Sequence, residues 1–281
     1  MKPIVITHGG VSQPLEHQDG VDAAADAALK VLDNGGNALQ AAVAAVVVME
    51  DDGRFDAGIG SYYNLDGEIE MDAAVMDGNE NCGAVAAIKN VKNPILVAQK
   101  LMDTPHILLA GQGAADYAKA VGFEHFEPGT EERKRRLEDV RRRIASGDVD
   151  SYAEKWKRYR RPGTVGAVVF DGKNGFGCAN STGGTSYQLP GRVGDSAVIG
   201  AGLYASAGGA VVTTGIGEDI IRKVLAKSVY DRIVIEGMSV KEACEWGVGL
   251  YPEKIPMGVV GVTADDHGWA ANNRMPVAKR F

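Results

Sequence analysis

The sequence predicts an α+β protein in which antiparallel β-sheets are covered by α-helices. Predicted strands occur in hairpin-like pairs and helices occur in blocks, rather than in strict β-α-β alternation. The chain has 281 residues, 45% of them hydrophobic and 24% charged, which is close to globular averages and sufficient for a sizeable core. Its 37 glycines indicate tight turns and close backbone approaches. One large layered domain and two small ones are both compatible with this length.

The first half of the chain begins with a strand-like segment, PIVITHGGV, that runs into a glycine turn. Residues 20–51 then predict two alanine-rich helices, with apolar residues at helical spacing and the stop signal NGG between them. The remaining elements follow in chain order: a hairpin over 61–76 that turns at Asp66-Gly67, a strand over 82–91, a helix over 93–103, a strand over 106–111 and a helix over 113–122.

Residues 128–163, which we call the basic connector, differ in composition from the rest of the chain. They contain 12 Lys or Arg and seven acidic residues, so the connector carries about +5 and the remainder about −12. Residues 131–145 predict a short helix, but its apolar stripe is weak, as is typical of a solvated segment. We therefore expect a flexible connector between two structured halves.

The second half of the chain returns to strands and helices after the connector. It contains a glycine-rich run over 183–206, which is expected to form turns. The predicted elements are strands over 164–171, 175–182 and 210–215, helices over 218–237 and 239–250, and strands over 257–265 and 267–273.

Charge and composition exclude several classes of function. A net charge of −7 and a pI near 5.3 argue against nucleic acid or an anionic membrane as a partner. The longest apolar stretch, Ala38 to Met49, is too short to span a bilayer. Three cysteines without metal-binding spacing fit a reduced, cytoplasmic setting. The chain also lacks a phosphate loop and a Gly-x-Ser-x-Gly elbow, and its five histidines lack metal-like partners at helical or hairpin spacing.

Thr164 stands at an unusual junction, between the end of the basic connector at Pro162-Gly163 and an apolar strand. A threonine can act as a nucleophile without a histidine if its own α-amine is the base, because a free α-amine titrates near 8. Such a threonine must first be released by cleavage of the preceding peptide bond. Gly163 permits unusual backbone angles that could strain that bond. The ordinary interpretation, that Thr164 simply opens a strand, stays open on these grounds alone.

Several motifs resemble, in order and in spacing, those of the threonine-dependent isoaspartyl peptidase and plant-type asparaginase family. They are HGG (8–10), DAGIGS (56–61), GEIEMDAAVMDG (67–78), GTVGAV (163–168), STGG (181–184), PGRVGDSAVIGAG (190–202) and TGIGE (214–218). The resemblance covers most of the chain apart from the connector and the last dozen residues. Members of this family are N-terminal nucleophile hydrolases.

The resemblance implies a four-layer αββα sandwich, two antiparallel sheets between helical layers, formed by a single domain over residues 1–281. It further implies self-cleavage between Gly163 and Thr164 into chains 1–163 and 164–281, which assemble as a dimer of cleaved pairs. A small-molecule or dipeptide substrate with a β-aspartyl amide bond is implied, such as asparagine or an isoaspartyl dipeptide. No organic cofactor is implied.

The resemblance also assigns roles to individual residues. Thr164 would be the nucleophile and, through its freed amine, the base. Thr182 would hydrogen-bond to the nucleophile and tune it. The implied substrate-binding and oxyanion-stabilising groups are the Arg192 guanidinium for the α-carboxylate, the Asp195 carboxylate for the α-ammonium, Gly217, the Thr214 hydroxyl and the Gly215 N–H.

Two positions bear on which member of the family this chain resembles. Gly184 in STGG is typical of the isoaspartyl peptidase and asparaginase branch, whereas glycosylasparaginases have Asn before the last Gly of that motif. Asp56 occupies a position where the family has Asn, and an ionised carboxylate there would repel a developing oxyanion. Glycosylasparaginase-like and protease-like activities, and an unprocessed non-catalytic scaffold, therefore remain alternatives.

The turn before Asp56 resembles a loop that binds structural sodium through backbone carbonyls, near residues 49–56.

Overall fold

The computed structural model describes residues 1–146, 152–161 and 163–281, and its described strands form two sheets. The part of the predicted connector at 147–151, and Pro162 before the predicted cleavage site, lie outside the described residues. The larger sheet has seven strands in the order β11-β1-β5-β6-β2-β3-β4, and the smaller has four in the order β10-β9-β8-β7. All pairings are antiparallel except that of β3 with β4. The predicted class, antiparallel sheets with helices, is confirmed.

The strands are short, as expected for glycine-punctuated segments. Those of the larger sheet are β1 (Ile4–His8), β2 (Met71–Asp77), β3 (Cys82–Ile88), β4 (Leu108–Ala110), β5 (Val165–Phe170), β6 (Phe176–Thr182) and β11 (Val277–Arg280). Those of the smaller sheet are β7 (Leu203–Ser206), β8 (Gly209–Gly215), β9 (Met257–Val262) and β10 (His267–Ala271).

The helices follow the predicted order, with local differences. They are α1 (Gln18–Asp33), α2 (Ala38–Glu50), α3 (Pro94–Leu101), α4 (Gly111–Ala120), α5 (Glu131–Ala145), α6 (Tyr152–Tyr159), α7 (Gly217–Lys223), α8 (Leu225–Val234) and α9 (Val240–Gly249). Helix α2 begins at a capping box, in which the side chains of Asn37 and Gln40 each accept a backbone N–H of the other.

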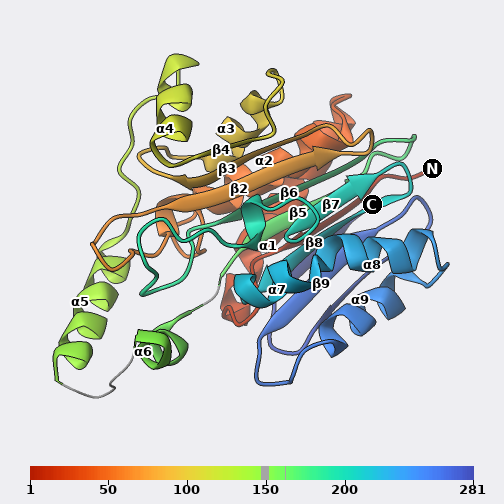
Figure 1. Cartoon of the computed structure of the whole chain (residues 1–281). Helices are drawn as coiled ribbons and strands as arrows, with labels where there is room; N and C mark the ends of the chain where they lie inside the picture. The colour runs from red at the N-terminus through yellow and green to blue at the C-terminus, as the bar shows by residue number, and fades with distance from the viewer. Residues whose placement is uncertain (147–151, 162) are drawn as a thin grey trace.

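Successive side chains of β5 point to opposite faces of its sheet, so the strand contributes residues to two hydrophobic clusters. Val165, Ala167 and Val169 belong to a cluster shared with α1, α2 and α3, whereas Val168 and Phe170 face the other sheet. The second cluster, between the sheets, includes Leu203, Val212 and Val260 of the smaller sheet. A third cluster lies between the smaller sheet and helices α8 and α9. Figure 1 shows α2 and α3 above the strands and α8 and α9 below them.

Four sequence-based predictions differ from the structure. The helix predicted over 218–237 is broken into α7 and α8 at Val224, whose φ of 47° is left-handed. The predicted hairpin over 61–76 is reduced to a single bridge between Tyr63 and Ile69 before β2. Strands β11 and β7 were not predicted, because the first lies in a polar C-terminal segment and the second in the glycine-rich run.

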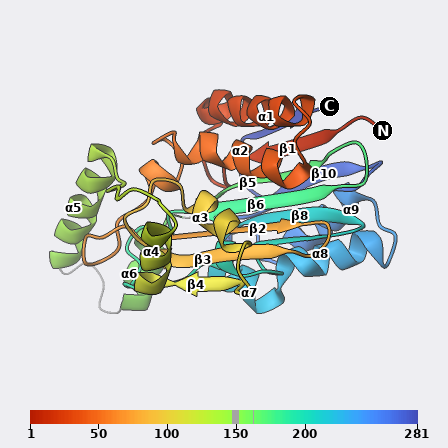
Figure 2. The same ribbon diagram turned by 90° about the horizontal axis from the view of Figure 1, so that it is seen from above.

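The connector is more ordered than its composition predicts. Helix α5 stands at one end of the sheets (Figures 1 and 2) and buries Arg133, Leu137 and Val140. Its Thr130 caps the helix by accepting the Arg133 N–H. Helix α6, within the described residues 152–161, was not predicted. Trp156 and Arg160 of this described part of the connector lie beside Gly163 and Thr164, where β5 begins.

Candidate active site

Thr164 lies directly before β5, and its side chain faces the space between the two sheets. Thr164 lies four and six residues before Val168 and Phe170, so its side chain is on the same face of the chain as these two residues of the cluster between the sheets. Only 3% of the surface of Thr164 is exposed. Strand β6 pairs with β5 so that Val165 lies opposite Ser181. Because the pairing is antiparallel, Thr182 at the end of β6 comes beside Thr164. The two threonines are thus brought together by one strand pair.

Both hydroxyl groups converge on the carbonyl oxygen of Gly163. The Thr164 Oγ1 and the Thr182 Oγ1 each donate to that oxygen at 2.6 Å. The Thr182 hydroxyl oxygen in turn accepts the Gly184 N–H at 3.1 Å, so its proton is directed at the carbonyl. Two hydroxyl groups therefore lie within hydrogen-bonding distance of the carbonyl oxygen of the Gly163–Thr164 peptide bond.

Close packing around residue 163 requires a glycine at that position. A Cβ at this position would lie 2.5 Å from the Asp56 Cβ, 2.8 Å from the Asp56 Oδ2 and 3.0 Å from the Gln13 Nε2. The absence of a side chain makes room for Asp56 beside the peptide bond.

Asp56 is completely buried, and its two oxygens have different surroundings. Its Oδ1 accepts the Tyr62 N–H at 3.3 Å, whereas its Oδ2 has no hydrogen-bond partner among the described residues. Burial raises the pKa of Asp56 well above its usual range, although the positive charge of Arg133 opposes this. Burial therefore favours the protonated carboxyl group, which can donate a hydrogen bond as an asparagine amide does.

Arg192 is partly buried, lines the same pocket as the two threonines and forms a bidentate ion pair. Its Nε and Nη2 donate to the Glu218 carboxylate at 2.9 and 3.1 Å. A Cβ on Gly217 would lie 2.9 Å from the Arg192 Nη2, so glycine there permits the close approach. The Asp72 carboxylate anchors the same loop by accepting the Gly194 N–H at 2.7 Å. The Nη1 edge of the guanidinium remains for a ligand carboxylate.

Asp195 lies on the other side of Gly217 and is buried. Its Oδ2 accepts the Thr213 hydroxyl at 3.3 Å. Burial raises the pKa of Asp195 to about 7, and the Arg192 charge limits the rise. The group therefore changes charge near neutral pH, and a ligand ammonium would stabilise its ionised form.

Thr214 and Gly215 end β8 close to the cleavage site. The Thr214 hydroxyl oxygen accepts the Val11 N–H at 3.2 Å, which leaves its proton to be donated. Gly215 lines a small pocket together with the two threonines, Gly163, Arg192, Asp195 and Gly217. Thr214 and Asp56 do not line this pocket, although Asp56 adjoins Gly163.

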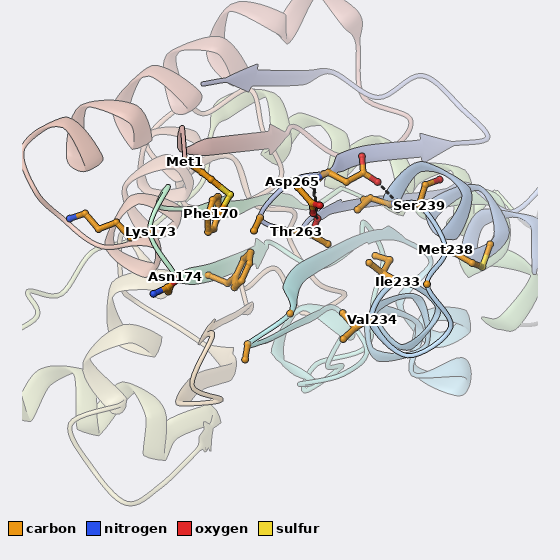
Figure 3. A pocket seen from close by; sticks show the side chains of 17 residues that line it. Met1, Phe170, Lys173, Asn174, Ile233, Val234, Met238, Ser239, Thr263 and Asp265 are labelled. Atoms are coloured by element: carbon orange, nitrogen blue, oxygen red, sulfur yellow. Dashed lines mark hydrogen bonds between the residues drawn. The ribbon is translucent and has the colours of Figure 1, made fainter.

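Helix α6 fills this pocket in the uncut chain. Trp156 and Arg160 line it, and the space left between them and the site is about 10 Å³, sufficient for about one water molecule. The Arg160 guanidinium lies 4.4 Å from the centre of the Trp156 ring. The described residues around this pocket leave no room for a ligand as large as an amino acid. A larger hollow of about 620 Å³ lies at the opposite end of β5 (Figure 3), and none of the described residues predicted for catalysis lines it.

Sequence reasoning missed three groups that the structure places at the site. Glu218 was interpreted only as an acidic residue at the start of a helix, yet its carboxylate accepts two hydrogen bonds from the Arg192 guanidinium. Asp72 lies within the motif at 67–78 but far in sequence from Gly194, its partner, and Trp156 lies outside every motif, so no local spacing could indicate their role. The TGIGE motif contained a signal for Glu218, because a buried arginine generally requires a carboxylate partner.

Two properties of the described residues concern membrane insertion and metal binding. No described helix has both the length and the apolar character needed to cross a bilayer. Within the same residues, no group of three or more His, Cys, Asp or Glu side chains could hold a metal ion.

Comparison with known proteins identifies the relatives of this chain. The asparaginase family model matches residues 1–278. The chain is 40% identical over 286 residues to the human isoaspartyl peptidase/L-asparaginase, covering 96% of this chain and 90% of that protein. It is also 40% identical over 288 residues to the plant-type L-asparaginase of Thermococcus kodakarensis, covering 96% and 93%. A match of this extent shows that the chain belongs to the asparaginase family.

Proposed function

We propose that this protein is a self-cleaving threonine amidohydrolase that cleaves β-aspartyl amide bonds, in L-asparagine and in isoaspartyl dipeptides. The observation that carries the proposal is the convergence of the Thr164 and Thr182 hydroxyls on the Gly163 carbonyl oxygen. The names of the relatives, isoaspartyl peptidase/L-asparaginase and plant-type L-asparaginase, support the substrate class.

Self-cleavage converts the Gly163–Thr164 amide into an ester and then into two chain ends. The Thr164 Oγ bonds to the Gly163 carbonyl carbon, the C–N bond breaks, and the nitrogen leaves as the α-amine of Thr164. Donation from Thr182 would stabilise negative charge on the Gly163 oxygen during this step. Water then hydrolyses the ester, giving the Gly163 carboxylate and a free Thr164 hydroxyl.

Substrate turnover uses the same threonine after α6 has left the pocket. The α-carboxylate of the substrate would bind at the Nη1 edge of Arg192, and its α-ammonium at Asp195 beside Gly217. The Thr164 Oγ attacks the side-chain carbonyl carbon, and its proton passes through the free α-amine to the leaving ammonia or amine. The Thr214 hydroxyl and the Gly215 N–H would stabilise the oxyanion, and water releases aspartate from the acyl-enzyme.

A neutral Asp56 supports the enzyme over the non-catalytic scaffold. The concern about this position was that an ionised carboxylate would repel the oxyanion. Burial favours the protonated form, which has the hydrogen-bonding capacity of the asparagine usual in the family. The side chain can then orient the Gly163 peptide without adding negative charge.

The wider organisation of the protein belongs to the same proposal. The three hydrophobic clusters, two under helices and one between sheets, support the four-layer αββα arrangement of N-terminal nucleophile hydrolases. We also propose a dimer of cleaved pairs, derived from one domain over 1–281, in a reducing cytoplasm that suits three free cysteines.

A structural sodium ion fits the turn before the site. Side chains at Gly58 and Gly60 would collide with the carbonyl oxygens of Glu50 and Phe55, so two glycines let backbone carbonyls crowd into a cradle. Carbonyl oxygens are hard ligands of the kind that alkali cations prefer. The ion would fix the loop that ends in Asp56.

Intact-mass spectrometry followed by activity assays tests the proposal. We expect two fragments, 1–163 and 164–281, and release of aspartate from asparagine and from β-aspartyl dipeptides. Faster turnover of a β-aspartyl glycosylamine or of a protein substrate would favour the glycosylasparaginase-like or protease-like branch. A persistent single mass without turnover would refute the enzyme and leave the scaffold.

A further inference from the structure

A basic cleft lies beside the candidate active site, on the outer side of the loop that carries Asp56. It encloses about 690 Å³ and is lined by the N-terminal loop, Arg54, Tyr62, helix α5, Arg161 and Arg274. Its lining includes seven arginines but only two carboxylates, those of Glu132 and Asp139. In a protein whose net charge is −7, such a concentration of positive charge requires an explanation.

Carboxylates of the described residues neutralise only part of this charge. Arg54 pairs with Asp19 and Asp52, and Arg142 lies 3.7 Å from Asp139. The remaining arginines of the cleft have no carboxylate partner among the described residues; these are Arg133, Arg135, Arg136, Arg161 and Arg274. The cleft therefore has unused positive charge from three separate parts of the chain.

Two arginines of α5 are held in place around one aromatic ring. The Arg133 guanidinium lies 4.1 Å from the centre of the Tyr62 ring and donates from Nε to the Gly60 carbonyl at 2.8 Å. The Arg136 guanidinium lies 5.7 Å from the same ring. Packing of this kind preorganises the two cations, so less conformational entropy is lost when a ligand binds.

Three buried polar atoms at the cleft lack hydrogen-bond partners among the described residues. The Nε of Arg136, the Oγ of Ser12 and the Nδ1 of His17 are buried and have no hydrogen-bond partner among the described residues. Burial lowers the pKa of Arg136, and the charges of Arg161 and Arg133 lower it further. An anion in the cleft would relieve this repulsion and satisfy the donors.

We propose that this cleft binds a small ligand with a chain of phosphate groups. Planar guanidinium forks match phosphate oxygens, and arginines from α5, from the end of the connector and from the β10–β11 turn can grip successive phosphates. A volume of about 690 Å³ is that of a small-molecule site and holds an inorganic tripolyphosphate or a nucleotide. The site is distinct from the aspartyl pocket and does not depend on the proposed function.

Isothermal titration calorimetry with sodium tripolyphosphate tests the proposal, using the full chain with Thr164→Ala so that Arg161 keeps its place. We expect one ligand per chain, affinity that falls as salt rises, and binding of inorganic phosphate at least about tenfold weaker. ATP in a parallel titration identifies the source of the phosphate chain. If ATP and tripolyphosphate bind with equal affinity, the cleft contacts only the phosphates. If ATP binds more tightly than tripolyphosphate, the nucleoside also contributes to binding.

A matched pair of double variants tests the location. Arg136→Gln with Arg274→Gln removes two cleft arginines from separate segments. Lys134→Gln with Arg143→Gln removes the same charge from α5 at exposed positions that do not line the cleft. The first should weaken tripolyphosphate binding at least about tenfold and the second less than about threefold, since long-range charge alone is screened. Arg274→Gln alone, in an exposed turn, gives the same comparison if the double variant does not fold.

Three results would overturn the proposal. The first is the absence of saturable binding at low salt. The second is an equal loss of affinity in the two double variants, because then only net charge matters. The third is stronger binding of single-stranded RNA in proportion to its length, which would identify a nonspecific polyanion surface.

Discussion

Replacement of Thr182 by valine tests the central feature of the site, the second hydroxyl on the Gly163 carbonyl. Valine has the same shape but cannot donate the hydrogen bond of 2.6 Å to the Gly163 oxygen. The loss of one donor to a developing oxyanion slows a reaction by about 10²- to 10³-fold, or about 3–4 kcal/mol of activation free energy. We expect self-cleavage to slow by that factor.

The same substitution also affects stability, which has to be measured separately. The Gly184 N–H now donates to the Thr182 oxygen at 3.1 Å and would lose its partner. A buried unpaired N–H costs about 1–3 kcal/mol. Urea unfolding measures this cost, while a denaturing gel over time, started from freshly purified chain, gives the cleavage rate.

Two controls separate the hydrogen bond from packing. Thr182→Ser keeps the hydroxyl and should cleave within about tenfold of the wild-type rate. Thr185→Val removes a nearby buried hydroxyl that has no hydrogen-bond partner among the described residues, and should leave cleavage unchanged. Cleavage of Thr182→Val within about threefold of wild type would refute the role assigned to the hydroxyl.

Further predictions concern neighbouring groups. Gly163→Ala places a Cβ 2.5 Å from that of Asp56, so we expect about 1–3 kcal/mol of lost stability in urea unfolding and slow cleavage on gels; normal cleavage would contradict the packing argument. Because burial favours the protonated carboxyl group of Asp56, which resembles an amide, Asp56→Asn should cleave within about threefold of the wild-type rate at neutral pH. The wild-type rate should fall at a pH high enough to ionise Asp56, whereas the rate of the variant should not. For substrate turnover, KM should rise about tenfold from pH 8 to pH 6, since Asp195 with a pKa of about 7 becomes protonated and no longer binds an ammonium; a flat KM profile would exclude that role. Burial raises the pKa of Glu50 to about 8. Between pH 4.5 and pH 8 the unfolded chain therefore loses the Glu50 proton while the folded protein keeps it. The free energy of unfolding of the wild type consequently decreases as the pH rises through this range. Glu50→Gln should remove up to about 3 kcal/mol of the fall between pH 6 and 8 in urea unfolding, and identical slopes would show that Glu50 is not protonated.

Local signals in the sequence were sufficient to predict most elements of the fold. The NGG stop between α1 and α2 and the apolar run of β5 depend on residues within a few positions of each other, so they can be recognised without tertiary contacts. The break at Val224 could not be predicted, because valine is rarely left-handed and only packing imposes that conformation. Strand β11 likewise depends on β1, its distant pairing partner.

For the site, the sequence by itself determined the residue types and their order: a threonine after a glycine at 163–164, and an arginine and an aspartate three residues apart. Tertiary structure alone decided which of these groups meet, because pairing of β5 with β6 places Thr182 on the Gly163 carbonyl. It also determined that the protonated form of Asp56 is favoured, since this preference follows from burial, which is a property of the whole fold. Glu218, which pairs with Arg192, and Trp156, which fills the pocket, are distant in sequence from Thr164. Only the packing of the folded chain brings them to the pocket.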